Sequence, residues 1–252
     1  MRLYFLNILF QADEARFERL MQRVRDLEPD VIAFVEADGW ARGRAERFAR
    51  EMKKDSYVAE SPSGLDLAVF APYGWMSEKA PVGAGLFFHG ACRVTIRPRT
   101  GGPFRLYTTH LNPKGEDRRL KEMDALLADA ASGPPGEPVL IVGDLNSVRG
   151  EDRIAGRPIA GIVPDENSPY WLHDKLPPKV IDRVLKDGWH DLYRELEPQA
   201  DGFTFPSTAP AARYDFTLAN AAMRPRVRGV QLLGSQADVQ VSDHLGLMVR
   251  VE

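Results

Sequence analysis

The sequence predicts an α/β protein in which two mixed β-sheets stack face to face, with helices on the outer faces. Short apolar runs such as Val31–Val35 are typical of strands that are buried on both sides. Segments with apolar residues at helical spacing lie between several of these runs. Both halves of the chain show this strand-helix-strand rhythm, with antiparallel segments between them, which favours two sheets.

In the first half, residues 2–9 form an apolar run that predicts the first strand. Apolar residues at helical spacing over 17–27 predict a helix, with Asp13 as its N-cap and Pro29 just beyond its end. Val31–Val35 is the second predicted strand. The next predicted elements are a helix over 41–52, strands over 56–59 and 65–71, a hairpin of residues 85–89 and 91–97, and a strand over 104–110.

In the second half, a helix over 120–130 leads to the apolar run 139–142, which is the central strand of the prediction. The irregular stretch from 150 to 178 is rich in Pro and Gly, and we expect a substrate-shaping loop there. A short helix over 178–186 follows. The last predicted strands cover 213–219, 226–233 and a final segment that ends at Val251.

Composition limits the classes of protein to consider. A chain of 252 residues without a linker-like segment favours a single domain over 1–252. Cys92 is the single cysteine, so no internal disulfide forms, and no apolar run is long enough to span a membrane. The first ten residues resemble a strand more than a signal peptide, so a cytoplasmic protein is expected. A net charge of -3 argues against a dedicated nucleic-acid binder.

Polar side chains follow several predicted strands at their carboxyl ends. Asp144 and Asn146 come directly after the central strand, Asn7 lies near the end of the first strand, Glu36 follows the second, and His110 ends the strand over 104–110. Ligand sites gather at such strand ends, where loops vary above a rigid sheet. An Asp-x-Asn pair is also an ordinary turn sequence, so this pair alone leaves both interpretations open.

Four further polar residues occur in or beside strands. Asp66 lies inside the strand over 65–71 and either faces solvent or faces the site and holds a histidine. Asp215 lies near the start of the strand over 213–219, and Asp243 and His244 lie at the entry to the last strand. His89 is expected to be an edge or turn residue.

Taken in order, these segments resemble the endonuclease/exonuclease/phosphatase superfamily, which has the DNase-I-like fold. The resemblance spans nearly the whole chain and is carried by residues 6–8, 29–36, 109–111, 143–146, 213–215 and 242–244. It implies a four-layer sandwich whose strand ends form one cleft. It also implies a phosphoester hydrolase that depends on Mg²⁺, with Mn²⁺ as an alternative ion.

The resemblance assigns the metal site to Glu36 as the principal ligand, with Asn7 and Asp243 completing or supporting it. Mg²⁺ prefers hard oxygen ligands, and one or two carboxylates with a substrate phosphate are enough to hold it. The Gln that often precedes the metal-binding Glu in the family is Val35 here, which removes a polar support but no ligand.

The resemblance also implies the catalytic roles. Asp144 and Asn146 would orient the attacking water and the phosphate, and His244, held by Asp215, would contact the phosphate or transfer a proton. Whether Asp144 or His244 accepts the proton of the water is left open.

His110 is similar to a second catalytic histidine of the nuclease and sphingomyelinase branches, with Asp66 as its carboxylate partner. The residues after His110 do not match the motifs of abasic-site endonucleases, which argues against a role in DNA repair.

The leading hypothesis is a phosphodiesterase, and the fold does not choose between nucleic acid and a phospholipid or small-molecule head group as its substrate. A phosphomonoesterase of the same fold is the alternative, and a non-catalytic binding module is a second class of function. A structural domain with scattered turn carboxylates is a third; its candidate residues would be dispersed instead of sharing one cleft. A monomer is expected.

Overall fold

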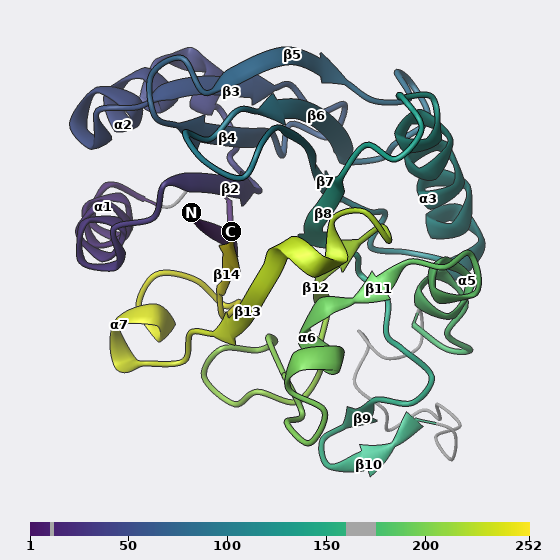
Figure 1. Cartoon of the computed structure of the whole chain (residues 1–252). Coiled ribbons are helices and arrows are strands. Elements are labelled where there is room, and N and C mark those ends of the chain that lie inside the picture. The colour runs from purple at the N-terminus through teal and green to yellow at the C-terminus, as the bar shows by residue number, and fades with distance from the viewer. Residues whose placement is uncertain (11–12, 160–174) are drawn as a thin grey trace.

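Two six-stranded mixed β-sheets form the centre of the computed structural model, which describes residues 1–10, 13–159 and 175–252 (Figure 1). The first sheet has the strand order β13-β14-β1-β2-β4-β3, and the second has the order β11-β12-β8-β7-β6-β5. Among the described strands, only the pairs β1/β2 and β7/β8 are parallel. The predicted fold class is therefore confirmed.

The strands have the following bounds. The first sheet consists of β1 (Arg2–Asn7), β2 (Val31–Val35), β3 (Asp55–Ala59), β4 (Leu67–Ala71), β13 (Val227–Leu232) and β14 (Leu247–Val251). The second sheet consists of β5 (Met76–Pro81), β6 (Gly90–Ile96), β7 (Phe104–His110), β8 (Val139–Asp144), β11 (His190–Asp191) and β12 (Asp215–Ala219). A separate ribbon pairs β9 (Arg153–Ile154) with β10 (Arg157–Pro158).

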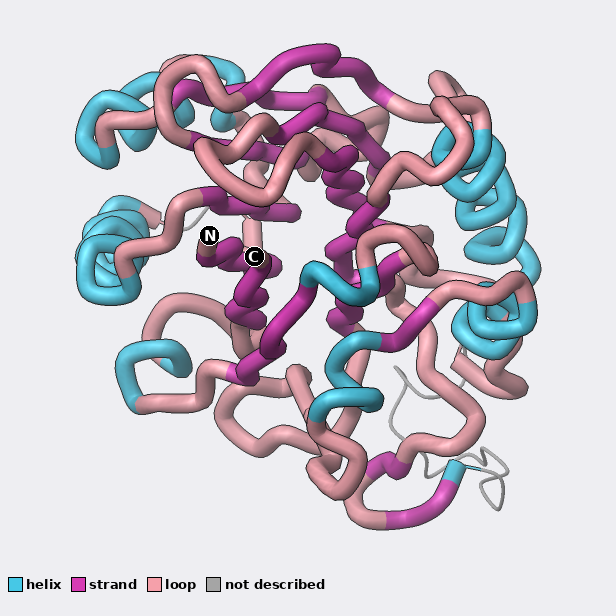
Figure 2. Tube along the Cα trace, in the orientation of Figure 1, coloured by secondary structure: helices cyan, strands magenta, loops and turns pink. Residues whose placement is uncertain are grey.

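Helices lie on the outer sides of the two sheets, as the cyan segments of Figure 2 show. The described helices are α1 (Glu14–Leu27), η1 (Trp40–Arg42), α2 (Arg44–Met52), α3 (Glu116–Ala131), α5 (Val180–Lys186), α6 (Leu192–Leu196), η3 (Arg224–Arg226) and α7 (Gln236–Val239). The Asp13 side chain accepts a hydrogen bond from the Arg16 backbone N–H, so the predicted N-cap of α1 is confirmed. None of the described helices is long and apolar enough to cross a bilayer.

Alternating side chains build three apolar layers. Leu3 and Phe5 of β1 join the core between the sheets, whereas Tyr4 and Leu6 pack under α1 and α2. Likewise, Leu140 of β8 faces the other sheet, and its neighbour Ile141 packs with residues of α3 and α5. The period of two along each strand thus produces a helix-sheet-sheet-helix sandwich.

One predicted strand is wrong. Residues 85–89 form a turn, and the strand that pairs with β6 is β5. Gly83 and Gly85 both have positive φ angles, of 56° and 80°, which interrupt an extended chain at this point. Phe87 lies in this loop, and its side chain is buried against the outer face of the second sheet.

The short helices α6 and α7 were not predicted, because four or five residues show no helical period. Most of the predicted substrate-shaping loop lies outside the described residues.

The strand directions bring several strand ends to one edge of the sandwich. The parallel neighbours β1 and β2 end there, as do β7 and β8. The antiparallel strands β12 and β14 begin there, since β12 pairs with β8 and β14 pairs with β1. The candidate residues come from these ends.

Candidate active site

Asn7 connects two carboxylates that come from different sheets. It is the last residue of β1, and its register partner Val35 directly precedes Glu36. Its side-chain Nδ2 donates to Glu36 Oε1 and to Asp144 Oδ2, both at 3.0 Å. Its Oδ1 accepts a hydrogen bond from the Leu9 backbone N–H. The amide therefore fixes the positions of two oxygen atoms at the edge of the sandwich.

Glu36 and Asn146 both have left-handed backbone conformations, with φ angles of 60° and 47°. Such angles cost a residue other than glycine roughly 1–3 kcal/mol and are frequent at functional sites. Glu36 Oε2 accepts a hydrogen bond from the Phe10 backbone N–H, and the Asn146 backbone N–H donates to Asp144 Oδ1. These bonds hold both residues in the turns that follow their strands.

Asp144 lies at the centre of the candidate residues. Strand pairing sets His110 beside it on β7 and Asp215 beside it on β12. Asp144 Oδ2 is 3.6 Å from His110 Nε2 and 3.8 Å from His244 Nε2. Burial raises the pKa of Asp144, but the charges of His244 and His110 outweigh this effect and hold it below its ordinary value.

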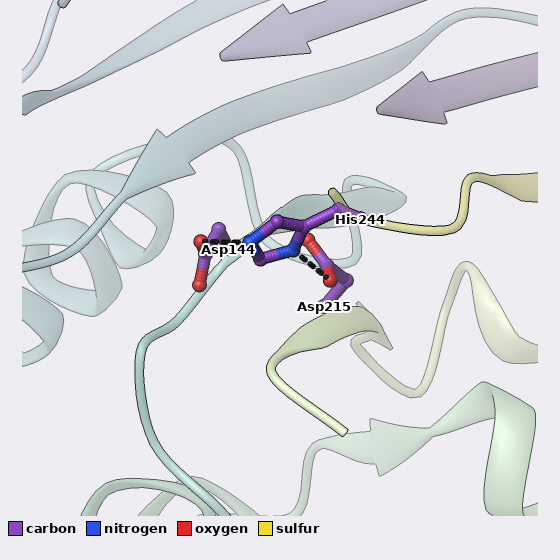
Figure 3. A group of neighbouring side chains, drawn as sticks. All are labelled: Asp144, Asp215 and His244. Carbon is purple, nitrogen blue, oxygen red and sulfur yellow. Dashed lines mark hydrogen bonds and ion pairs between the residues drawn. The ribbon is translucent and has the colours of Figure 1, made fainter. Parts of the chain in front are cut away.

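His244 is held between two carboxylates (Figure 3). Its Nδ1 forms a 2.8 Å hydrogen bond with Asp215 Oδ2, and its Nε2 faces Asp144. Burial by itself would lower the pKa of His244, but the charges of Asp215, Asp144 and Asp243 raise it to about 10. The imidazole is thus a cation at neutral pH, in a site that it shares with carboxylates.

Asp243 adds a third carboxylate to those of Glu36 and Asp144. Burial raises the pKa of Asp243; the charge of His244 opposes this effect, and the charges of Glu36 and Asp144 add to it. Mutually repelling carboxylates with hard oxygen atoms suit a divalent cation such as Mg²⁺ or Mn²⁺. Among the described residues, Asp144, Asp215 and His244 also place ligand atoms within 4.8 Å of one another. The hydrogen bond between Asp215 and His244 occupies one ligand atom of each residue. The carboxylates around Glu36 are therefore better suited to hold a cation than this second group.

Residues 5–244 match the endonuclease/exonuclease/phosphatase family. The chain belongs to this family. Its members are hydrolases that act on phosphoesters. A comparison with curated protein sequences gives no significant match.

Solved structures of family proteins share the fold at low sequence identity. An AP endonuclease from Archaeoglobus fulgidus superposes with a TM-score of 0.75 at 15% identity, covering 100% of this chain and 99% of that chain. A 3'-5' exonuclease (NExo) from Neisseria meningitidis gives 0.73 at 16% identity, covering 100% of both chains. The human nocturnin catalytic domain, with a bound sulfate anion, gives 0.70 at 17% identity, covering 99% of this chain and 92% of that chain.

In this family member, the Asn146 side chain is already engaged by protein groups. Its Nδ2 donates to the Leu111 carbonyl at 3.1 Å, and its Oδ1 accepts from Lys175 Nζ at 2.9 Å. Lys175 is buried and also donates to the Pro113 carbonyl. It brings a cation to the site that sequence analysis missed, although it lies in the stretch predicted to shape the substrate site.

The expected pairing of Asp66 with His110 does not form. Asp66 Oδ1 accepts a hydrogen bond from the Ser61 backbone N–H, so its own loop holds the carboxylate. His110 Nδ1 has no hydrogen-bond partner within the described ranges. The neighbour of His110 is His89, whose ring stacks on it at 4.0 Å and 12°.

His89 lies in the turn before β6, as predicted, and it is also buried next to the site. Its Nδ1 lies 2.7 Å from Ser63 Oγ. Burial lowers the pKa of His89 to about 3 and that of His110 to about 4. The stacked pair is therefore neutral at physiological pH, in contrast to His244. The sequence contains no signal for this stack, because it depends on the path of the loop before β6.

All the candidates except Asp66 are joined by hydrogen bonds, short ion-pair distances or mutual charge effects at one edge of the sandwich. These residues therefore form one cluster, whereas a structural domain would have dispersed turn carboxylates.

Proposed function

We propose that the chain is a single-domain, Mg²⁺-dependent phosphodiesterase in which water attacks the phosphorus atom. The main support is His244, which is buried, 2.8 Å from Asp215 and directed at Asp144, the carboxylate that Asn7 links to Glu36. This arrangement combines a fixed cation for phosphate oxygens with a carboxylate for water. Membership of a family of phosphoester hydrolases supports the reaction class.

Glu36 and Asp243 would hold the metal ion, with Asn7 positioning Glu36 through its 3.0 Å hydrogen bond. A bound Mg²⁺ supplies positive charge to phosphoryl oxygens and to the leaving group. The chain supplies these oxygen ligands from separate strand ends, so the ligand positions depend on the packing of the sandwich.

Asp144 is the group that we propose accepts the proton of the water. Its pKa is held below the ordinary value, so it is ionised at neutral pH. His244 is already protonated and is suited to donating a hydrogen bond to the phosphate from Nε2. Asp215 positions His244 and fixes Nδ1 as the donor toward its own carboxylate. Asn146, with Lys175, presents a polar surface next to Asp144.

The proposed substrate is a phosphodiester of nucleic acid or of a lipid or small-molecule head group. The test is hydrolysis of bis-p-nitrophenyl phosphate and of p-nitrophenyl phosphate, each with Mg²⁺, Mn²⁺ or EDTA. We expect metal-dependent cleavage of the diester, lost in Glu36→Ala and in His244→Ala. His190→Ala is the matched control, because His190 forms a similar 2.7 Å contact with Glu195 but is partly exposed and remote from the candidates.

Faster cleavage of the monoester than of the diester would favour the alternative function, a phosphomonoesterase of the same fold. Metal-independent activity, or full activity in both variants, would contradict the assigned residues. No cleavage combined with no effect of millimolar Mg²⁺ on thermal unfolding would favour a binding module. The expectation of a cytoplasmic monomer stays a prediction.

A further inference from the structure

A hollow of about 310 Å³ lies beside the candidate site, and none of the residues assigned to catalysis lines it. Its lining includes Leu86, Phe88, Asn112, Arg118, Lys121 and Glu122. These residues come from the loop before β6, the loop after β7 and the helix α3. The hollow is therefore a separate feature of the second sheet and its covering helix.

The hollow adjoins the His110 side of the site. The Phe88 ring contacts the His89 ring edge to face at 4.8 Å, and His89 stacks on His110. Asn112, on another wall, is two residues beyond His110. Two ring contacts therefore connect the wall of the hollow at Phe88 to His110.

Glu122 holds the walls of the hollow in position. Its side chain is buried, and its two oxygens accept hydrogen bonds from the backbone N–H groups of Phe88 and Asn112, both at 2.7 Å. One carboxylate thus ties two loops to α3 and sets the distance between the walls. Ordering these loops before binding lowers the entropic cost of binding a ligand.

The walls of the hollow differ in chemistry. Leu86 and Phe88 are 47% and 48% exposed, and both line the hollow, so two large apolar side chains meet solvent at one place. Arg118 and Lys121 are exposed at one-turn spacing on α3, and neither forms an ion pair with a carboxylate of the described chain. An apolar, partly aromatic wall therefore faces two unpaired cations.

We propose that this hollow binds a nucleotide next to the scissile phosphodiester of a single-stranded nucleic acid. The base would stack on Phe88 beside Leu86, and the following phosphate would contact Arg118 and Lys121. This inference rests on the proposed phosphodiesterase function and names its substrate class. A nucleotide carries a flat, largely apolar base a short distance from a negatively charged phosphate. The base matches the apolar wall of the hollow, and the phosphate matches the basic wall.

A lipid chain fits the hollow less well, because it needs a continuous apolar surface and here it would meet two cations. The net charge of -3 agrees with contacts to only a few nucleotides, since extended nucleic-acid binding relies on many basic residues.

The test measures binding without cleavage. A fluorescein-labelled deoxyadenosine hexamer is titrated with the full chain in EDTA, and anisotropy is recorded. We expect Phe88→Ala to weaken binding about 5- to 30-fold through loss of stacking. We expect Arg118→Ala combined with Lys121→Ala to weaken binding and to reduce the salt dependence by about 0.7 in the slope of log K against log salt, for one phosphate contact.

Tyr73→Ala and Arg50→Ala are the matched controls, since Tyr73 is an exposed aromatic residue and Arg50 an exposed helical cation outside the hollow. Both should bind the hexamer as the unmodified chain does. Equal binding by the hollow variants would overturn the proposal. Binding to phosphatidylglycerol vesicles but not to the hexamer would also overturn it, in favour of a lipid.

A second measurement separates this proposal from the proposed function. The ratio of kcat/KM for the hexamer to that for bis-p-nitrophenyl phosphate should fall at least fivefold in Phe88→Ala. Hydrolysis of the small diester without hexamer binding would leave the phosphodiesterase in place and overturn the nucleotide site. Hexamer binding that the hollow variants weaken, without hydrolysis of either compound, would support the site and contradict the enzyme.

Discussion

Asp215 and His244 are held 2.8 Å apart, and both are buried. The charge of Asp215 is the largest of the effects that raise the pKa of His244, against the opposing effect of burial. Because His244 lies between Asp215 and Asp144, loss of one charge alters both the charge and the orientation of the imidazole.

We expect Asp215→Asn to lower kcat on a phosphodiester by about 10²- to 10⁴-fold, the range for losing a positioned acid or base. The amide has nearly the same shape as the carboxylate, so the circular dichroism spectrum should be unchanged. Asp187→Asn, at a surface ion pair with Arg183, is the control and should keep full activity. Activity within twofold of the unmodified chain would mean that Asp215 does not position His244.

At the same scale, Asn7 separates the carboxylates of Glu36 and Asp144 with a single amide group. Replacing this amide with a carboxylate removes both hydrogen-bond donors and adds a further negative charge. The repulsion should be relieved by a divalent cation.

We expect Asn7→Asp to lower the free energy of unfolding by roughly 3 kcal/mol in EDTA, as for an uncompensated buried charge. Mg²⁺ should then raise the Tm of this variant more than that of the unmodified chain. Asn7→Ala loses the donors without adding charge, so it should not show the larger Mg²⁺ effect. Thermal unfolding with and without Mg²⁺ measures this, and equal Mg²⁺ effects in both variants would contradict a cation site here.

At the scale of elements, Arg213 joins the segment before β12 to two other parts of the chain. Its guanidinium donates to both oxygens of Asp191, at 2.8 and 2.6 Å, and to Asp152 at 2.8 Å. All three residues are buried. Because Arg213 is two residues before Asp215, this network helps to place the carboxylate that holds His244.

Burial raises the pKa of Asp191, but Arg213 outweighs burial and holds it below the ordinary 3.8. A lowered pKa means that the stabilisation is present above pH 3.8 and is lost as the pH falls below it. We therefore expect Asp191→Asn to cost about 3 kcal/mol at pH 7 and progressively less below pH 3.8. Urea unfolding of both proteins across this range measures the difference, and a constant difference would contradict the assigned charge effect.

At the scale of the whole molecule, the site depends on the packing of two sheets. Asn7 and Glu36 come from the first sheet, and His110, Asp144 and Asp215 come from the second. The hydrogen bond from Asn7 to Asp144 spans the two sheets, so any change in their separation should alter the site.

Leu140 tests this dependence, since it is fully buried between the sheets on the strand that ends at Asp144. We expect Leu140→Ala to lower the free energy of unfolding by about 2–5 kcal/mol and to reduce activity as the sheets relax around the cavity. Leu86→Ala removes an exposed leucine and should cost less than about 0.5 kcal/mol. Similar costs in urea unfolding would show that the inter-sheet core tolerates the cavity.

The sequence by itself determined the fold class, most strands and the strand-end positions of the candidate residues. Apolar runs and helical periods are local patterns, and in the chain Glu36 directly follows its strand while Asp144 ends its own. The order of the motifs then indicated the family, which residues 5–244 confirm.

Only the tertiary structure decided which side chains meet. His89 instead of Asp66 lies against His110, Lys175 reaches Asn146, and Glu122 ties Phe88 to Asn112. The physical reason is that these contacts join residues far apart in sequence. They depend on strand register, on turns with positive φ and on loop paths, none of which leaves a periodic pattern in the chain.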